Sequence, residues 1–250
     1  MYTREKKPSE IAAMRESGRM LATVLELLRH SAKPGMSTMD LNIIAEKELQ
    51  SLGGKPAFLG YQGFPAVLCV SINDEVVHGI PSKDKIIEDG DIVSLDFGVV
   101  FDSMITDAAI SVIVGNPRSE EDVRLVKMTE KSLLDGINVI KDGVKVGDIA
   151  ESIQKRLDSN KFGIVRDLVG HGVGHDLHED PNIPNYGHRG QGPILRKNMT
   201  IAIEPMATLG GYEVKVGRDG WTILTADGSR SAHFEHTVLI TETGAEILTR

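Results

Sequence analysis

The sequence predicts an α+β fold in which two similar helix-helix-sheet halves surround a central antiparallel sheet, with the helices outside. Two observations support this class. Helical periodicity occurs in two pairs, and each pair is associated with short apolar runs separated by turn residues. A short motif of the first helix pair also recurs in the second, which indicates an internal repeat.

The first helix pair begins at two serines, which are good N-cap residues. Ser9 precedes a helix with apolar residues on one face, and the Lys-Pro-Gly run from Lys33 ends that helix. Ser37 precedes the second helix and places Asp40 at its third position, as in a capping box. The glycine pair from Gly53 is predicted to stop this helix.

The second helix pair follows the same plan. Ser119 caps a long helix that ends at Asp142-Gly143, and the fourth helix runs from about Asp148 to Asn160. Apolar runs predict strands at residues 66–72, 91–100, 103–114, 199–207, 212–217, 221–225 and 234–240.

The repeat becomes visible when the chain is shifted by 108 residues. The matching positions fall on the same helix-turn-helix of each half: Lys33 with Lys141, Gly35 with Gly143, Asp40 with Asp148, Lys47 with Lys155 and Leu49 with Leu157. No linker rich in Pro, Gly or Ser separates the halves. We therefore expect a single domain over residues 1–250, with halves at about 9–115 and 116–250.

The bulk composition restricts the class of function. A net charge of −8 argues against a general nucleic-acid binder, which needs a basic face. Cys69 is the only cysteine, so no intrachain disulfide can form, as is usual in a reducing compartment. The first ten residues lack the apolar core of a signal peptide, and no stretch reaches the ~18 apolar residues of a membrane span. We expect a cytoplasmic protein.

Two aspartates lie within adjacent apolar strands. If the chain turns at Phe101-Asp102, Asp96 and Asp107 are directly opposed and share one face of the sheet. Two such carboxylates on a buried face are costly without a cation between them. The alternative for this pair alone is an edge hairpin with both aspartates facing solvent.

Three histidines follow one another within a glycine-rich segment. His171 lies in Gly-His-Gly-Val-Gly, where flanking glycines allow close approach of a ligand. His175 and His178 follow. The spacing of His171 and His175 matches a zinc-binding helix, but the glycines argue against a helix here. A lone histidine is more often a hydrogen-bonded residue without function, so the cluster carries the prediction.

Two glutamates lie at or within predicted strands. Glu204 ends an apolar run at a proline, and Glu235 belongs to another apolar strand. By alternation, His233 and Glu235 face the same side of the sheet, whereas His236 faces the other side. Each glutamate taken alone could be a salt-bridged structural residue.

Together, these residues predict a two-metal centre. Four carboxylates and one imidazole suit hard to borderline divalent ions, and without metal the carboxylates would repel one another. The predicted ligands are Asp96, Asp107, His171, Glu204 and Glu235.

The chain resembles the type I methionine aminopeptidases of the pita-bread fold over nearly its whole length. The motifs that carry this resemblance are Asn73-Asp-Glu-Val-Val-His78-Gly-Ile-Pro81, Asp96, Asp107, Gly170-His171-Gly-Val-Gly174, His178-Glu-Asp-Pro181, Ile203-Glu204-Pro205-Met206, Trp221 and Glu235-His236-Thr237. Only 33 positions separate His171 from Glu204, so the helical insertion of type II enzymes is absent. The chain is similar to the short bacterial form.

The resemblance implies a role for each metal ligand. Asp96 would chelate one metal, His171 and Glu204 would bind the other, and Asp107 and Glu235 would bridge both. A hydroxide between the metals would attack the first peptide bond. Glu204 would also shuttle a proton.

The resemblance also implies the residues that handle substrate. His178 would polarise the scissile carbonyl and stabilise the oxyanion, while His78 would contact the scissile amide or assist the leaving amine. The substrate amine would bind the metal on the Asp96 side. The methionine pocket would contain Tyr61, Phe64, Cys69, Leu177 and Trp221. Asn73 and Ser231 match positions that bind a monovalent cation in some relatives.

Some positions depart from the family pattern. Leu177 replaces a frequent Phe, Phe64 a frequent Tyr and Gln62 a frequent His, which affects the pocket shape. His233 stands where Gln is common. It is either an additional group that tunes the metal centre or a neutral hydrogen-bonding substitute.

The predicted function is removal of the initiator methionine from chains with a small second residue. One alternative is a prolidase or Xaa-Pro aminopeptidase, which usually carries an extra N-terminal domain that has no room before Ser9. The other is a catalytically inactive pita-bread module that binds proteins. We expect Co, Mn, Fe or Zn at the metal sites, nascent polypeptides near the ribosome exit as partners, no specific nucleic acid or membrane contact, and a monomer.

Overall fold

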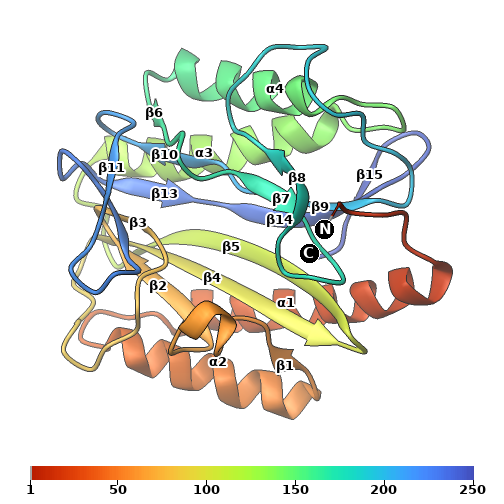
Figure 1. The fold of residues 1–250 in the computed structure, drawn as a ribbon. Helices are drawn as coiled ribbons and strands as arrows, with labels where there is room; N and C mark the ends of the chain where they lie inside the picture. The colour runs from red at the N-terminus through yellow and green to blue at the C-terminus, as the bar shows by residue number, and fades with distance from the viewer. Residues whose placement is uncertain (1) are drawn as a thin grey trace.

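The computed structural model describes residues 2–250 as helices packed around a set of strands (Figure 1). Its helices are α1 (Pro8–Ser31), α2 (Thr38–Leu52), η1 (Tyr61–Gly63, a 3-10 helix), α3 (Glu120–Asn138) and α4 (Val146–Ser159). Its strands are β1 (Lys55–Pro56), β2 (Leu68–Ile72), β3 (Glu75–Val77), β4 (Asp91–Phe101), β5 (Met104–Val114), β6 (Gly163–Ile164), β7 (Gly170–Gly172), β8 (Glu179–Ile183), β9 (Thr200–Ile203), β10 (Met206–Thr208), β11 (Val214–Val216), β12 (Ile223–Thr225), β13 (Ser231–His233), β14 (Glu235–Ile240) and β15 (Ala245–Ile247).

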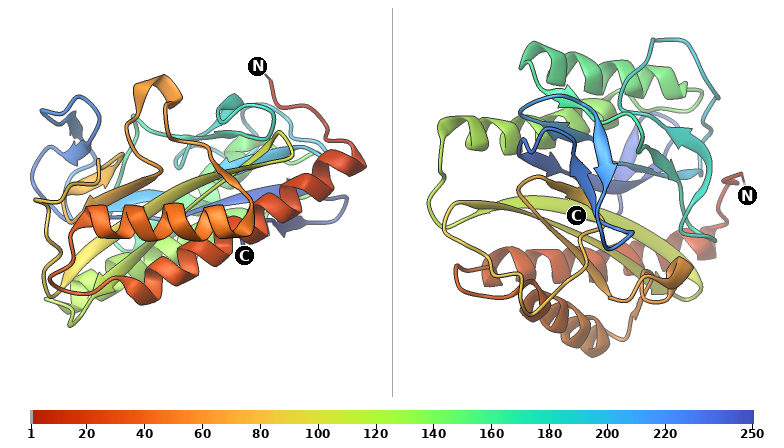
Figure 2. Two further views of the ribbon diagram at one scale, coloured as in Figure 1. Left: turned by 90° about the horizontal axis from the view of Figure 1, so that it is seen from below. Right: turned by 60° about the vertical axis from the view of Figure 1, so that its left-hand side comes forward.

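The helices form two pairs on opposite sides of the strands (Figures 1 and 2). Helices α1 and α2 pack on β2, β4 and β5. Helix α3 packs mainly on β13, β5 and β10, and α4 packs on β6 and β8. Apolar residues at helical spacing, such as Leu21, Leu25 and Leu28 on α1, join one continuous core with Ile149 and Ile153 on α4. The predicted arrangement of two helix-helix-sheet halves is confirmed.

The central sheet joins strands of both halves. Its order is β1-β4-β5-β14-β9-β7-β8, with β2 pairing on β4 and β15 on β14. Each of these pairings is antiparallel. The halves meet where β5 pairs with β14, at Ala109 with Glu235 and at Ala108 with His236.

Two hydroxyl groups extend this short pairing on either side. Thr237 Oγ accepts the N–H of Asp107 and donates to its carbonyl oxygen, both at 2.8 Å. Ser111 Oγ does the same for His233, also at 2.8 Å in each case. We call these contacts the seam hydroxyls. They replace ladder hydrogen bonds and so fix Asp107 and His233 across the junction.

The recurring motif corresponds to recurring hydrogen bonds. Gly35 N–H donates to Ile87 O at 2.8 Å, and 108 residues later Gly143 N–H donates to Leu195 O at 2.9 Å. Isolated bridges show the same shift, since Ser37 pairs with Ile86 and Lys145 with Ile194. The duplication predicted from sequence is therefore visible in backbone geometry.

Several predicted boundaries were wrong. The N-cap of α1 is Lys7 rather than Ser9, because Pro8 suits the first turn and the Glu10 carboxylate accepts the Lys7 N–H at 2.8 Å. Helix α3 ends at Asn138, before the predicted Asp142-Gly143 stop. The strand predicted at 199–207 is interrupted at Glu204-Pro205 between β9 and β10.

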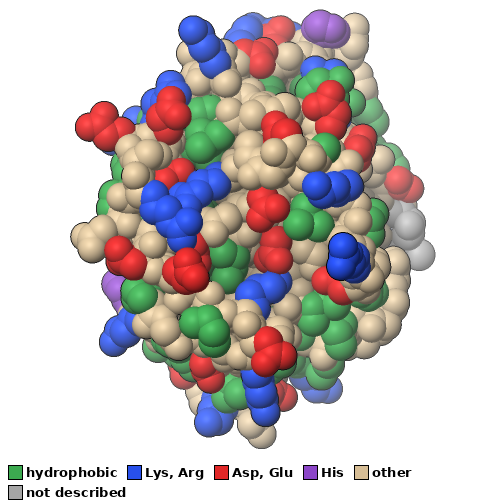
Figure 3. Space-filling view, turned by 90° about the vertical axis from the view of Figure 1, so that its left-hand side faces the viewer, with side chains coloured by type: hydrophobic (Ala, Val, Ile, Leu, Met, Phe, Trp, Pro, Cys, Tyr) green, Lys and Arg blue, Asp and Glu red, His purple; other side chains and the backbone are tan. Residues whose placement is uncertain are grey.

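Charged side chains of both signs are interspersed on the face drawn in Figure 3. Such a face does not form the continuous basic surface that phosphate binding requires. Within residues 2–250, no helix has the combined length and apolar character needed to cross a membrane.

Replacing Thr237 with Val tests the seam hydroxyls. Valine keeps the shape but leaves the buried N–H and carbonyl of Asp107 without the hydroxyl partner, so unfolding free energy should fall by about 2–4 kcal/mol. Urea denaturation measures the change. Thr243→Val, at an exposed turn, is the control and should stay within about 0.5 kcal/mol of wild type. Equal stability of both variants would contradict the role of this hydroxyl.

Candidate metal centre

One cavity of about 150 Å³ brings the predicted site residues together. The five predicted metal ligands, both predicted catalytic histidines and all five predicted pocket residues line it: Asp96, Asp107, His171, Glu204, Glu235, His78, His178, Tyr61, Phe64, Cys69, Leu177 and Trp221. Phe58, Gln62 and Val77 complete the lining. Asn73 and Ser231 lie outside it.

Strand register places three of the carboxylates close to one another. Ala109 of β5 pairs with Asp96 on one side and with Glu235 on the other, so these positions form a row across β4, β5 and β14. Asp107 lies two residues along β5, on the same face as Ala109. The sheet thus directs carboxylates from both halves toward one region.

The predicted direct opposition of Asp96 and Asp107 was wrong by two residues. The turn consists of Asp102 and Ser103, whose φ values of 47° and 63° are those of a tight type I′ hairpin. Asp107 therefore pairs with Gly98, and Asp96 is its diagonal neighbour. A shift of two preserves the alternation, so both carboxylates still share the buried face.

His171 and Glu204 approach from β7 and from the end of β9. His171 pairs with Ala202, and its Nε2 lies 3.6 Å from Glu204 Oε1. His171 Nδ1 lies 2.9 Å from the Gly172 carbonyl oxygen, which can only accept, so Nδ1 carries the proton. The unprotonated Nε2 is thereby free to bind a metal.

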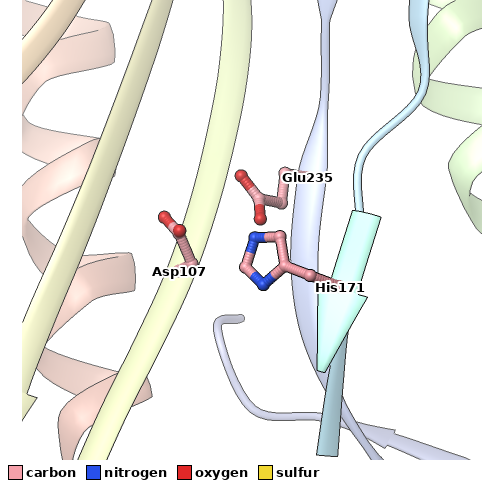
Figure 4. Close-up of side chains that lie close together, drawn as sticks. All are labelled: Asp107, His171 and Glu235. Atoms are coloured by element: carbon pink, nitrogen blue, oxygen red, sulfur yellow. The ribbon is translucent and has the colours of Figure 1, made fainter. Parts of the chain in front are cut away.

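Three of these side chains form a compact group. Figure 4 shows Asp107, His171 and Glu235 pointing toward one another from separate strands. One ligand atom from each lies within 4.8 Å of the others, and all three residues are buried. This spacing suits a shared cation, since oxygen and nitrogen ligands lie about 2 Å from such an ion.

The electrostatics of the site favour a bound cation. Burial raises the pKa of Asp96 to about 7, against a lowering by its hydrogen bond with Asp107. Burial and neighbouring carboxylates also raise the pKa values of Asp107, Glu204 and Glu235 well above their usual range. Buried oxygens of Asp96, Asp107 and Glu235 lack a hydrogen-bond partner among residues 2–250. Divalent ions would satisfy these atoms and remove the repulsion.

Two further histidines line the cavity beside the carboxylates. His178 Nδ1 lies 2.9 Å from the Tyr61 hydroxyl, and the His178 ring is 4.3 Å from that of His171. Burial lowers the pKa of His178. Burial, together with His178, lowers the pKa of His78 to about 4. Both imidazoles are therefore neutral at physiological pH and can donate or accept hydrogen bonds.

The apolar end of the cavity is a small hydrophobic cluster. Phe58, Phe64, Ala66, Cys69 and Leu177 are buried in it, and Tyr61 and Trp221 pack against it. The Phe64 and Trp221 rings meet edge to face, with centroids 5.2 Å apart. Phe58 was not predicted from the sequence, where its only signal is an aromatic residue near the predicted pocket residues. The cavity therefore suits a ligand that has an apolar side chain at one end and a polar group at the other, beside the carboxylates.

Residues 12–242 match the metallopeptidase family M24. The chain belongs to this family. It is 46% identical over 245 residues to methionine aminopeptidase 1 of Bacillus subtilis, covering 98% of each chain. It superimposes on the crystal structure of methionine aminopeptidase from Thermotoga maritima with a TM-score of 0.97 and 49% identity, covering 99% of each chain. The resemblance predicted from motifs is thus confirmed.

A more distant likeness concerns the fold alone. Prolidase from Pyrococcus furiosus aligns with a TM-score of 0.78 and 22% identity, covering 98% of this chain and 65% of that chain. The predicted pita-bread architecture of this M24 chain is confirmed by both structural comparisons. The metallopeptidase family implies use of divalent metal, and the buried Asp107, His171 and Glu235 could hold such an ion.

Asn73 and Ser231 form a separate polar site in this M24 chain. Ser231 Oγ lies within hydrogen-bonding distance of two carbonyl oxygens, that of Asn73 at 2.9 Å and that of Glu75 at 3.1 Å, and can donate its one proton to either. Asn73 adopts a φ of 59° and bonds through its side chain to Asp91 and Ile92. Two main-chain carbonyl oxygens therefore converge beside one hydroxyl.

The N-terminal segment of this M24 chain forms a buried ion pair with the loop that contains His178. Lys6 Nζ is fully buried and lies 3.2 Å from Glu179 Oε2. Glu179 Oε1 accepts the N–H groups of His175 at 2.7 Å and Asp176 at 3.2 Å. Burial alone would raise the pKa of Glu179, but its hydrogen bonds and the Lys6 charge outweigh it and lower the pKa. This ion pair was not predicted from the sequence, because its members are 173 residues apart.

Replacing Lys6 with Met should destabilise the protein by roughly 3–5 kcal/mol, because Glu179 would stay buried without its partner. Urea denaturation measures this change. The double variant with Glu179→Gln should recover part of the loss, because Gln keeps an acceptor for the loop but carries no charge. The exposed pair of Arg15 and Glu246 supplies the control, since Arg15→Met should cost under about 1 kcal/mol. Equal losses for Lys6→Met and Arg15→Met would refute this assignment.

Metal-free protein should lose stability as pH rises from about 7 to 9, a range in which the histidines of the unfolded chain are already mostly neutral. In this range the folded-state pKa values of the clustered carboxylates are raised, to about 7 for Asp96, so the folded state binds more protons than the unfolded chain. The stabilising protons are lost as pH rises through these folded-state values. Differential scanning calorimetry in chelator measures the decline in Tm.

Two comparisons complete this test. Saturating Mn²⁺ should raise Tm, and by more at pH 8 than at pH 5, because the metal competes with protons for the same oxygens. Asp96→Asn should show a shallower decline in chelator, because it removes one titrating carboxyl. A chelated wild-type Tm that rises steadily from pH 7 to 9 would contradict the expected sign.

Proposed function

We propose that this chain removes the N-terminal methionine from peptides and nascent proteins with a small second residue. The observation that carries the proposal is the single cavity, in which an apolar cluster lies directly beside the clustered carboxylates and His171. The apolar end suits a methionine side chain, and the polar end suits hydrolysis of the bond that follows it. The names of the relatives agree with this function.

The five cavity ligands would hold two divalent ions. Asp96 would bind one ion, His171 and Glu204 the other, and Asp107 and Glu235 would bridge them. Bound there, the ions would acidify water and polarise the peptide carbonyl. Carboxylate and imidazole ligands are compatible with Co, Mn, Fe or Zn.

Protein groups around the ions would position the substrate and move protons. His178, in contact with Tyr61, would donate a hydrogen bond to the scissile carbonyl oxygen as negative charge develops there. Glu204, whose pKa is raised by burial, would transfer a proton toward the leaving amine. His78 would contact the scissile amide. The substrate amine would lie on the Asp96 side, which restricts cleavage to chain ends.

The setting of this activity follows from the same proposal. Nascent chains leaving the ribosome in the cytoplasm would supply the substrate, and the enzyme would act as a monomer. Asn73 and Ser231 would help to bind a monovalent cation, for which the converging carbonyl oxygens of Asn73 and Glu75 are suitable ligands. Leu177 and Phe64 would shape the methionine pocket.

Tripeptide hydrolysis tests the proposed function. Met release from Met-Ala-Ser should exceed release from Met-Pro-Ser, stop after chelation, and return with at least one of Co, Mn, Fe and Zn. Asp107→Asn should lower kcat/KM by at least ~100-fold, since loss of a bridging ligand should exceed the 10–100-fold effect of outer contacts. Absence of metal-dependent release from Met-Ala-Ser would reject the proposal, and a preference for Xaa-Pro peptides would indicate a prolidase.

A further inference from the structure

His233 is a buried imidazole aimed at the proposed metal ligands. It is 1% exposed, and its Nε2 lies 3.7 Å from Glu204 Oε2 and 4.0 Å from Glu235 Oε2. Neither ring nitrogen has a hydrogen-bond partner among residues 2–250. A buried polar atom without a partner costs roughly 1–3 kcal/mol. An imidazole in this place therefore calls for a functional explanation.

The backbone of His233 is fixed on two sides. His233 pairs with Met206 of β10, and its N–H and carbonyl oxygen both contact Ser111 Oγ at 2.8 Å. The position of the ring is therefore set by the backbone contacts with β10 and with Ser111. Its nearest charged neighbours are the two glutamates of the cavity.

Glu204 lies between two imidazoles. Its Oε1 is 3.6 Å from His171 Nε2, and its Oε2 is 3.7 Å from His233 Nε2. One carboxylate oxygen thus faces the predicted metal ligand, while the other faces His233. A movement of about 0.8 Å would bring His233 within hydrogen-bonding distance of Oε2.

We propose that His233 is a positioning residue that donates its Nε2–H to Glu204 Oε2 and thereby presents Oε1 to the metal ion. The inference rests on the proposed two-metal centre. Hydrogen bonds to ionised carboxylates are strong, and contacts of this outer kind fix the orientation of metal ligands. All five proposed ligands line the cavity, whereas His233 is not among the lining residues, which favours this indirect role over direct metal binding.

Metal titrations of His233 variants test the proposal. Metal-free wild type, His233→Leu and His233→Gln are titrated with Mn²⁺ by isothermal titration calorimetry. His233→Leu should bind at least one ion roughly 10–100-fold more weakly, whereas His233→Gln, whose amide can still donate, should stay within about threefold of wild type. His236→Gln is the control. It lies in the adjacent strand, and its side chain contacts Thr249 on the other face of the sheet, so metal affinity should not change.

The absorption spectrum of the Co²⁺-loaded variants provides a second readout. His233→Gln should keep the wild-type band positions and intensities, because the directly bound ligands are unchanged. Loss of affinity in His233→Gln as large as in His233→Leu, together with an altered spectrum, would show direct ligation and overturn the proposal. Unchanged Mn²⁺ affinity in His233→Leu would overturn it too.

Two further controls separate the causes of failure. If wild type binds no metal, the proposed two-metal centre itself is wrong, whereas normal binding by wild type and His233→Leu refutes only the role of His233. Thermal melts in chelator show whether His233→Leu folds. If it does not fold, His233→Met, which also lacks a donor, takes its place with the same expected loss of affinity.

Discussion

The constraint on which this structure depends is the burial of four carboxyl groups in one seam of an apolar sheet. Asp96, Asp107, Glu204 and Glu235 share a cavity in which burial and mutual repulsion disfavour their charged forms. Charge of this density in a core requires either protons or cations. Family membership and the neutral His171 both favour cations.

The rest of the fold holds this arrangement in place. Helices cover the outside of the sheet, and the short pairing of β5 with β14 is extended by the seam hydroxyls of Ser111 and Thr237. Thr237 fixes the backbone of Asp107, and Ser111 fixes that of His233. The same side-chain contacts that join the two halves therefore also position groups of the site. A change in these contacts is therefore expected to alter both the stability of the junction between the halves and the geometry of the cavity.

The duplicated architecture explains the origin of two of the ligands. The 108-residue shift that relates the hydrogen bonds of the two halves also relates Asp96 to Glu204. Each half thus contributes one carboxylate at an equivalent position. Asp96 lies within β4, and Glu204 directly follows β9. The remaining differences, such as the break at Pro205 and the glycine-rich strand β7, belong to the second half. His171 also has no counterpart in the first half, because the position 108 residues earlier is Gly63.

The sequence alone determined which residues of a strand face the same side of the sheet, because alternation along a strand is a local property. It therefore placed Asp96 with Asp107 and His233 with Glu235, and its motifs predicted the cavity residues. Tertiary structure decided the distances, because contacts between residues far apart in the chain depend on register and packing. The turn at Asp102-Ser103 sets the pairing of the aspartates two residues away from the predicted one. Phe58 lines the cavity, and Lys6 contacts Glu179, which is 173 residues away in the chain. The orientation of the His233 ring toward Glu204 likewise depends on the packing of β13, β10 and β5, which are far apart in the sequence.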